Sequence, residues 1–556
     1  MYTIGLDFGT SSVRALLVDV RSGEEVATSV FQFPSGENGI LLDRREPDLA
    51  RQNPQDYIGG LEASISGALE KASAGGRFDP ADVIGIGVDT TGSTPLPVDA
   101  AGRPLAFDPR FRDNLNAHVW LWKDHSSSAE AVEITGRARE IRPEYLAKCG
   151  GTYSSEWFWS KILHCLRVDP DVFNAAYTWV EHADWMPALL TGTDRPDRIQ
   201  RGICAAGHKA LFNAAWGGYP DETFLGGLDD RLVELRRTLP SETYNASRAA
   251  GTLTDEWADR LGLRAGIPVA IGAFDAHLGA IGSGIVPGTL VKIIGTSTCD
   301  LMIAPLENEM TDIPGLCGIV PESVIPGQYG LEAGQSAVGD IFDWFVSKIQ
   351  PAANDHASLT AGAEALRPGE SGLLVLDWHN GNRTVLVDQR LTGLIVGLTL
   401  HTTPAEIYRA LVEATAFGAR VIMEQFEAYG VPVERIVNCG GISAKNRLVM
   451  QIYADVMNRP LQISRSAQTC ALGAAVSAAV AAGAGAGGHA SFAQAVDAMT
   501  GVQDVAFEPV SENAEIYDRV YAIYRVLHDA FGVRGERHDL YDVMKMLLNI
   551  RDEVRS

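Results

Sequence analysis

The sequence predicts an α/β protein with two lobes, and three observations lead to this prediction. The chain has 556 residues, more than a single hydrophobic core usually organises. Strand-like and helix-like apolar patterns alternate along it. A plan of strand, polar glycine turn and strand occurs in TIGLDFGTSSVRALLVDV (3–20) and again in GTLVKIIGTSTCDLMIA (288–304), which indicates an internal duplication.

The period of the apolar residues predicts the elements in order. Besides the two repeated strand pairs, strands are expected at VIGIGVD (83–89) and RIVNCGG (435–441). Helices are expected at 154–166, 184–192, 410–430 and 443–458. Ser154 and Ser155 are interpreted as caps of the first helix, and Trp157, Phe158 and Trp159 as packing residues.

Glycine and proline cluster at GSGIVPG (282–288), where we expect the boundary between the lobes. The expected parts are an N-terminal domain at 1–284, a C-terminal domain at 285–510 and a helical extension at 511–556. The extension has the pattern of a charged amphipathic helix, and we interpret it as a packing or interface element.

Composition excludes several classes of function. The net charge of −24 argues against a general binder of nucleic acid or anionic membranes, so an anionic ligand must be held by local groups. The seven cysteines are scattered without a CxxC pair, which favours a reducing compartment. No secretory signal pattern is visible at Met1, and the Ala/Gly tract at 471–488 is too broken by glycines for a membrane span. We therefore expect a cytoplasmic protein.

Motif scanning removes further classes. The sequence contains no GxxxxGK[ST] loop, no HExxH and no GxSxG elbow, so P-loop, zincin and α/β-hydrolase chemistry lack their residues. A GxGxxG match at 483–488 follows a helix-like tract, whereas dinucleotide binding needs strand, turn and helix in that order. We interpret it as a loop.

The two glycine turns indicate a nucleotide site. Exposed amides and hydroxyls in DFGTSS (7–12) and GTSTCD (295–300) can form a nest for phosphate, and Asp7 can hold a metal ion through water. One such turn alone is usually a simple hairpin, but a pair resembles the phosphate loops that face each other in actin-like ATPases. In VNCGGISAKN (437–446), a glycine pair between strand and helix lets an adenosine lie against backbone; alone, it would be an ordinary strand-to-helix turn.

The order of motifs along the chain resembles the FGGY carbohydrate kinases, from residue 3 to about 510. Within that family, WKDH (122–125), YSSEWFW (153–159), AGHKAL (206–211) and GLEAGQSAVGDIFDWF (330–345) favour the branch that acts on L-ribulose over the glycerol, xylulose and gluconate branches. The motifs that carry the resemblance are DFGTSS, GVDTTGSTPLP, SSEWFWSKI, AGHKAL, GAFDAH, GTSTCD, LEAGQS, RLTGLIVGL, EATAFGA and GGISAKN.

The resemblance implies two ribonuclease-H-like lobes of the actin and hexokinase type around a catalytic cleft. It also implies ATP with Mg²⁺ and transfer of the γ-phosphoryl group to the 5-hydroxyl of a ketopentose such as L-ribulose, in arabinose catabolism. The alternatives are another FGGY kinase, for D-ribulose, xylulose or a polyol, and a non-kinase actin-like ATPase. A chaperone ATPase would need a peptide-binding domain, and the chain after about 510 is too short for one. A homodimer is the common default.

Asp275, in IGAFDAHLGA (271–280), is the expected catalytic base. Phosphoryl transfer proceeds through a loose transition state, so even a weakly basic carboxylate can accept the hydroxyl proton late in the reaction. The residue ends an apolar strand and small residues follow it, which leaves room for a substrate. The alternative is a helix N-cap, and both roles are compatible with a strand end.

The remaining site residues are carried over from the resemblance. Each has an alternative as a turn, a core residue or a solvated surface group. The expected sugar contacts are Gly92, Ser93, Thr94, Trp122, Lys209, Asp275 and Glu332. The expected phosphate contacts are Thr10, Ser11, Ser12, Gly295, Thr296 and Ser297. The expected adenosine contacts are Gly440, Gly441 and Asn446, and the expected Mg²⁺ ligands are Asp7 and Asp275.

Overall fold

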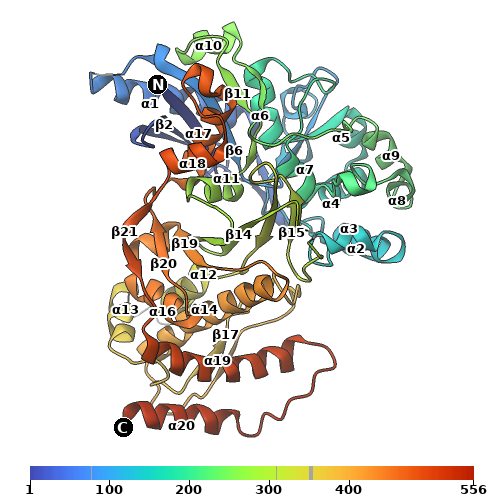
Figure 1. Ribbon diagram of the computed structural model, residues 1–556. Helices are drawn as coiled ribbons and strands as arrows, with labels where there is room; N and C mark the ends of the chain where they lie inside the picture. The colour runs from blue at the N-terminus through green and yellow to red at the C-terminus, as the bar shows by residue number, and fades with distance from the viewer. Residues whose placement is uncertain (77, 309, 350–354) are drawn as a thin grey trace.

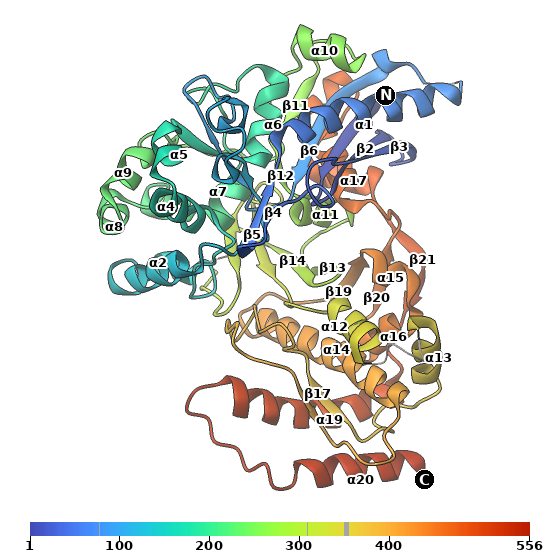
Figure 2. The ribbon, with the colours of Figure 1, turned by 180° about the vertical axis from the view of Figure 1, so that it is seen from behind.

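The computed structural model describes residues 1–76, 78–308, 310–349 and 355–556. Figures 1 and 2 show a long molecule in two halves, and each half contains one seven-stranded β-sheet besides smaller ones. The first sheet has the order β10-β11-β6-β1-β2-β3, and β12 also pairs with β6. Its strands are β1 (Tyr2–Phe8), β2 (Ser12–Asp19), β3 (Glu25–Gln32), β6 (Val83–Thr90), β10 (Ala249–Thr252), β11 (Pro268–Ala270) and β12 (Ala273–Phe274).

The second sheet has the order β15-β16-β14-β13-β19-β20-β21 and repeats the plan of the first. The hairpin β1–β2 lies beside the parallel strand β6, and the hairpin β13–β14 lies beside the parallel strand β19. The duplication predicted from the two glycine turns is thus visible in strand order and direction. The strands are β13 (Thr289–Ile294), β14 (Thr298–Pro305), β15 (Gly318–Pro321), β16 (Gln328–Ala333), β19 (Arg435–Cys439), β20 (Leu461–Ser464) and β21 (Val502–Phe507).

Helices cover both sheets, and two of them lie between the sheets. In the first half, α1 (Pro54–Ala74), α6 (His182–Thr191) and α10 (Asp255–Leu261) pack on one face of the first sheet. Its other face packs on α11 (Asp275–Gly282), α17 (Thr469–Ala482) and α18 (Phe492–Met499). Side chains of the second sheet, including Val291 and Val437, belong to the same hydrophobic cluster as α11 and α17. These two helices therefore connect the halves.

The Ala/Gly tract is the central helix α17, and its small residues have a steric reason. A Cβ on Gly87 of β6 would come within 1.9 Å of the Ala474 carbonyl oxygen, and one on Gly473 within 1.8 Å of that of Leu278. The backbone of α17 therefore approaches both β6 and α11 too closely for larger side chains. Among the described residues, no helix combines the length and apolar character that a membrane span requires.

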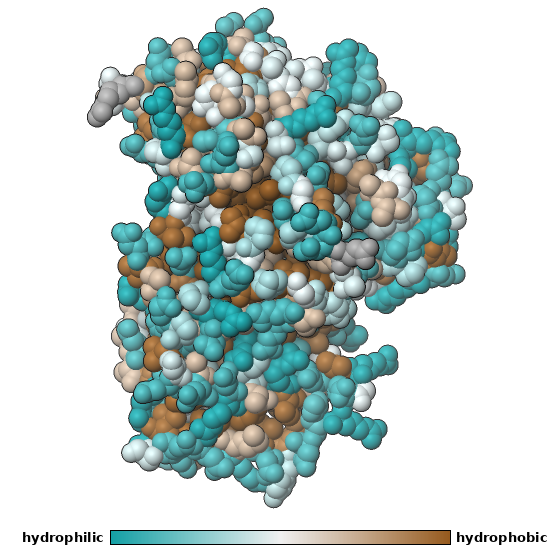
Figure 3. Space-filling model, in the orientation of Figure 1, coloured by the Kyte–Doolittle hydropathy of each residue, from teal (hydrophilic) through white to brown (hydrophobic). Residues whose placement is uncertain are grey.

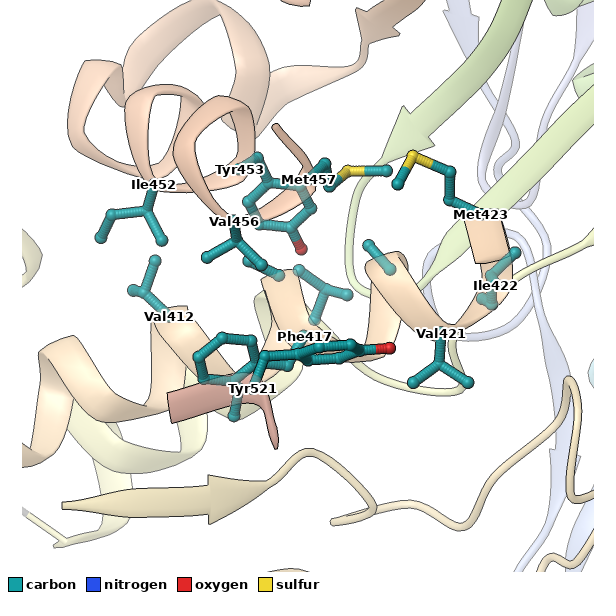
Figure 4. Close-up of a cluster of buried hydrophobic side chains, with 14 of the residues drawn as sticks. Val412, Phe417, Val421, Ile422, Met423, Ile452, Tyr453, Val456, Met457 and Tyr521 are labelled. Carbon is teal, nitrogen blue, oxygen red and sulfur yellow. The ribbon is translucent and has the colours of Figure 1, made fainter. Parts of the chain in front are cut away.

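The outer face of the second sheet packs on α14 (Pro404–Ala428) and α16 (Arg447–Met457), and α19 (Ser511–Gly532) packs against α16 on the side away from the sheet. Figure 4 shows Phe417 of α14 close to Tyr521 of α19, with Val456 of α16 nearby. The buried Tyr524 of α19 also donates a hydrogen bond to Asp377 at 2.9 Å. The segment after 510, which ends in α20 (Val543–Arg555), thus supplies part of the core of the second half.

Several helix boundaries differ from the predictions, and the helix expected at 410–430, α14, already begins at Pro404. The helix expected at 154–166 is α4 (Phe158–Val168), whose N-cap is Trp157, so Ser154 and Ser155 do not cap it. The helix expected at 443–458 is broken at Asn446 into α15 (Gly441–Lys445) and α16. The Asn446 side chain accepts a hydrogen bond from the Val449 amide at 3.2 Å, which starts a new helix at a position where the apolar period alone shows no break.

Candidate active site

Three aspartates meet at the carboxyl ends of neighbouring parallel strands in the first sheet. Asp7 of β1 is paired with Asp89 of β6, and the next strand, β12, pairs Ala273 with Asp89. Asp275 follows β12 directly as the first residue of α11, after Phe274 as the N-cap. Ligands commonly bind at such strand ends in α/β sheets.

Burial raises the pKa of all three aspartates, although a hydrogen bond with Asp89 lowers the pKa of Asp7. Burial raises the pKa of Asp275 to about 7, and the Asp7 carboxylate contributes. Burial and the carboxylates of Asp7 and Asp275 raise the pKa of Asp89 well above its ordinary value. Burial also raises the pKa of Asp7, although Arg14, with a nitrogen 3.5 Å from its carboxylate, opposes this. Such a group of carboxylates is well suited to bind a cation.

Lys209 and Glu332 form a buried ion pair that joins the two halves. Lys209 ends α7 (Ile203–Lys209) of the first half and Glu332 lies on β16 of the second. The Lys209 Nζ lies 3.0 and 3.1 Å from the two Glu332 oxygens. Burial favours the neutral form of Glu332, but the Lys209 ammonium and His208 hold its pKa well below the ordinary value. The glutamate is therefore an ionised acceptor and the lysine a charged donor at one place.

A cavity of about 260 Å³ brings Asp275 together with this ion pair, whereas Asp7 and Asp89 are not among its lining residues. Asp275, Lys209 and Glu332 all line it, and the second glycine turn forms another part of its wall. Of the expected sugar contacts, Gly92 and Trp122 also line this cavity. The wall residues from the second turn are Gly295, Thr296, Ser297, Thr298 and Cys299.

A second cavity of about 880 Å³ lies in the second half. Gly441 and Asn446, two of the expected adenosine contacts, line it together with Tyr408 and Ile442. Gly440 is not among its lining residues; it has φ +97°, and a Cβ there would lie 2.4 Å from the Ile294 carbonyl oxygen. Gly440 therefore shapes the turn that presents Gly441.

The two cavities share one wall. Gly295 and Thr296 line both of them. A ligand that filled the larger cavity and extended along this turn would enter the cavity that Asp275 lines. An elongated molecule with a terminal anionic group fits this arrangement because the turn offers backbone amides and hydroxyls.

The first glycine turn lies against the smaller cavity through Trp122. The Trp122 ring nitrogen donates a hydrogen bond to the Thr10 hydroxyl at 3.0 Å. The Thr10 carbonyl accepts a hydrogen bond from the Gln52 side chain, and the Ser11 carbonyl accepts one from the Phe33 amide. Thr10, Ser11 and Ser12 are half-buried and are not among the lining residues of either cavity.

Ser93 and Thr94 are directed away from the cavity. Both are fully buried, and both bond to Glu181, Thr94 through its amide at 2.8 Å. The buried ammonium of Lys161 binds the Ser93 carbonyl at 2.8 Å. These contacts hold the loop that presents Thr91 and Gly92 to the cavity, so the two side chains support the site from behind.

Several residues near the site were not predicted. Arg383 lines the smaller cavity, and His277 lines it beside His208, with ring centroids 4.3 Å apart. Burial lowers the pKa of both histidines, so they are neutral beside Glu332. Asp89 had a signal in the sequence: IGLDFG, IGVDTT and IGAFDA each place an aspartate after a short apolar run. The two histidines lie within the motifs AGHKAL and GAFDAH but were given no role there, and Arg383 had no comparable local signal.

A carboxylate beside a charged donor–acceptor pair, in a cavity that shares a glycine turn with a second cavity, suits the transfer of an anionic group to a hydroxyl. Together with two sheets of repeated plan, this site suits a phosphotransferase with the two-domain fold of actin-like ATPases.

Comparisons with known proteins identify the family. Residues 2–282 match the FGGY family of carbohydrate kinases, N-terminal domain, and residues 290–482 match its C-terminal domain. The chain belongs to the FGGY family of carbohydrate kinases. It is similar to a ribulokinase of Shouchella clausii, with 44% identity over 100% of this chain and 99% of the relative. A ribulokinase of Mycolicibacterium smegmatis is 41% identical over 100% and 98%.

Solved structures support the fold. A xylulose kinase from Rhodospirillum rubrum has a TM-score of 0.75 and 25% identity over 95% of this chain and 99% of its own. A glycerol kinase of Plasmodium falciparum, solved with ADP, has a TM-score of 0.76 and 17% identity over 94% and 98%. The predicted resemblance and fold class are confirmed.

Proposed function

We propose that this kinase transfers the γ-phosphoryl group of ATP to the 5-hydroxyl of a ketopentose, with L-ribulose as the preferred substrate. The observation that carries the proposal is the wall of Gly295 and Thr296 shared by two cavities, one lined by Asp275, Lys209 and Glu332. Similarity to ribulokinases over the whole chain supports the choice of sugar.

In this proposal, Asp275 orients the acceptor hydroxyl and accepts its proton as the new O–P bond forms. Lys209 donates to a carbonyl or hydroxyl oxygen of the sugar, and Glu332 accepts from a hydroxyl. Gly92 leaves room for the Phe274 ring at this wall of the cavity, because a Cβ on residue 92 would collide with that ring. Trp122 offers an apolar face to the sugar carbons.

For the nucleotide, Gly441 and Asn446 lie at the adenosine with Gly440 behind them. The turns at 10–12 and 295–297 hold the phosphates. Asp7 and Asp275 would hold Mg²⁺, and their carboxylates are the hard oxygen ligands that this ion prefers. The bound ion would neutralise charge on the phosphates.

A coupled assay of ADP release tests the proposal. The acceptors are L-ribulose, D-ribulose, D-xylulose, L-xylulose, ribitol, glycerol and gluconate. L-ribulose should have the highest kcat/KM. A higher value for another acceptor would assign the chain to a different branch of the family, and ADP release that no acceptor stimulates would contradict a sugar kinase.

We also propose that the protein works in the cytoplasm as a homodimer. All seven cysteines are free, which supports a reducing compartment. Symmetric dimers are the commonest oligomers, and light scattering combined with size-exclusion chromatography gives the mass in solution.

A further inference from the structure

Helix α19, in the segment after residue 510, is linked by hydrogen bonds to the interior of the second half. The Tyr524 hydroxyl donates to one oxygen of Asp377 at 2.9 Å. The other oxygen of Asp377 accepts from the Gln335 side-chain amide at 2.8 Å. All three side chains are buried, where hydrogen bonds are stronger than in water. Asp377 therefore fixes Gln335 relative to α19.

Gln335 lies shortly after β16 and its backbone holds the second glycine turn. Its carbonyl accepts from the Thr298 amide at 3.1 Å, and its amide donates to the Thr298 hydroxyl at 2.9 Å. The amides of residues 338–340 donate to the carbonyls of Gly295 and Thr296 at 2.8 to 3.1 Å. The segment that begins with Gln335 thus fixes the backbone of the turn that lines both cavities.

Helix α14 packs tightly against this link. A Cβ on Gly418 would lie 2.3 Å from the Asp377 oxygen and 2.7 Å from the Gln335 nitrogen, the two atoms of the hydrogen bond between these side chains. The same nitrogen also donates to the Thr415 carbonyl of α14 at 2.8 Å. The pair is confined between two helices, so the loss of one partner displaces the next instead of being absorbed by empty space.

We propose that Tyr524 is a positioning residue for phosphoryl transfer. Through Asp377 and Gln335, it holds the second glycine turn in the conformation that binds the phosphates of ATP. The inference rests on the proposed function, because it requires that this turn hold the phosphates. It gives a role in the reaction to a segment that lies beyond residues 290–482, the part matched by the C-terminal domain of the family.

The test compares Tyr524→Phe with Tyr517→Phe, a matched control on the same helix. The Tyr517 hydroxyl is also buried and also donates to a carboxylate, Glu413 of α14, at 2.9 Å. Its other hydrogen bond comes from Arg409, so within the described part of the chain neither bond leads to Asp377. Each variant loses one buried hydroxyl, and their Tm values should fall by similar amounts.

Activity separates positioning from stability. Initial rates with ATP varied at a saturating concentration of the preferred sugar give kcat/KM for ATP, and calorimetric titration gives the affinity for ADP. Tyr524→Phe should lower kcat/KM for ATP by roughly 3–30-fold, the range typical of coupling between distant residues, and weaken ADP binding. Tyr517→Phe should keep both values close to those of the wild type. Equal losses in the two variants, or wild-type values for Tyr524→Phe, would overturn the inference.

A double-mutant cycle tests the route through Asp377. Asp377→Asn leaves one acceptor oxygen for two donors, so it breaks the same link. If Tyr524 acts through Asp377, adding Tyr524→Phe to Asp377→Asn should lower kcat/KM for ATP little further. Losses that simply multiply would overturn the inference.

Thr296→Ala separates the inference from the proposed function, because Thr296 lines both cavities. If this variant keeps the wild-type kcat/KM for ATP, the turn does not hold the phosphates and both proposals fail. If Thr296→Ala lowers kcat/KM for ATP while Tyr524→Phe does not, only the role of Tyr524 is wrong.

Discussion

At the residue scale, the ionisation of Asp275 should control the reaction. Its pKa is raised to about 7, chiefly by burial, and a base must be ionised to accept a proton. Lower pH therefore protonates and inactivates it, so kcat/KM for the sugar should rise with pH until about 7 and then level off. Rates measured from about pH 5 upwards give the profile, and a flat profile below 7 would contradict the assignment.

The Asp275→Asn variant tests the same residue by removing its charge. Sugar phosphorylation should fall by roughly 10²–10⁴-fold, the usual contribution of a general base, while ADP binding stays near normal. Initial rates and calorimetric titration with ADP provide the two measurements. Turnover close to that of the wild type would show that another group accepts the proton.

The ion pair of Lys209 and Glu332 links stability to sugar binding. Lys209→Met should destabilise the protein by about 3–5 kcal/mol, because it leaves a buried carboxylate without its partner. Adding Glu332→Gln should restore part of this loss, since the pair is then neutral. Urea unfolding measures both effects. Lys209→Met should also raise the KM for the sugar more than it changes background ATP hydrolysis, and equal changes would count against a sugar contact.

At the element scale, the close packing of helix α17 on strand β6 requires a glycine at position 87 of the strand. Gly87→Ala would place a Cβ within 1.9 Å of the Ala474 carbonyl oxygen, and such overpacking typically costs about 1–3 kcal/mol or more. The control is Gly59→Ala in α1, where a Cβ meets nothing within 4 Å and should stabilise the helix by about 0.5–1 kcal/mol. Urea unfolding compares the variants, and equal stability would mean that α17 can shift at little cost.

At the scale of the whole molecule, the site is divided between two halves joined by α11 and α17. Asp275 and Lys209 come from the first half, whereas Glu332 and the turn at 295–297 come from the second. Binding of sugar and nucleotide together should draw the halves closer and exclude water from the phosphoryl group. Small-angle X-ray scattering should show a smaller radius of gyration with both ligands, and an unchanged radius would contradict closure.

The surface of the whole molecule agrees with its composition. Figure 3 shows mostly hydrophilic residues on the face seen in Figure 1, as expected for a chain with a net charge of −24. This charge makes local groups necessary for binding ATP. Arg383, which lines the smaller cavity, is a cation of that kind that the motifs did not reveal.

A site residue could be predicted from the sequence when its role depends on its neighbours in the chain, and not when it depends on a residue far away in the sequence. Asp7, Asp275 and the two glycine turns stand in short motifs whose chemistry is local, so the sequence alone was enough to propose them, and the structure places Asp275 and the second turn at one cavity. Ser93 and Thr94 were expected at the sugar, but Glu181, which is distant in sequence, binds both of them behind the loop. No local pattern reports such a partner.

The sequence by itself determined the α/β class, the duplicated strand plan and the family, because apolar period and short motifs are local properties of the chain. Only the tertiary structure decided that Asp89 faces Asp7, that Glu332 pairs with Lys209, and that one turn lines two cavities. The first feature depends on strand register. The ion pair depends on packing between segments that are more than a hundred residues apart in the sequence. Such contacts arise from the burial of the whole chain, which no single stretch of sequence encodes.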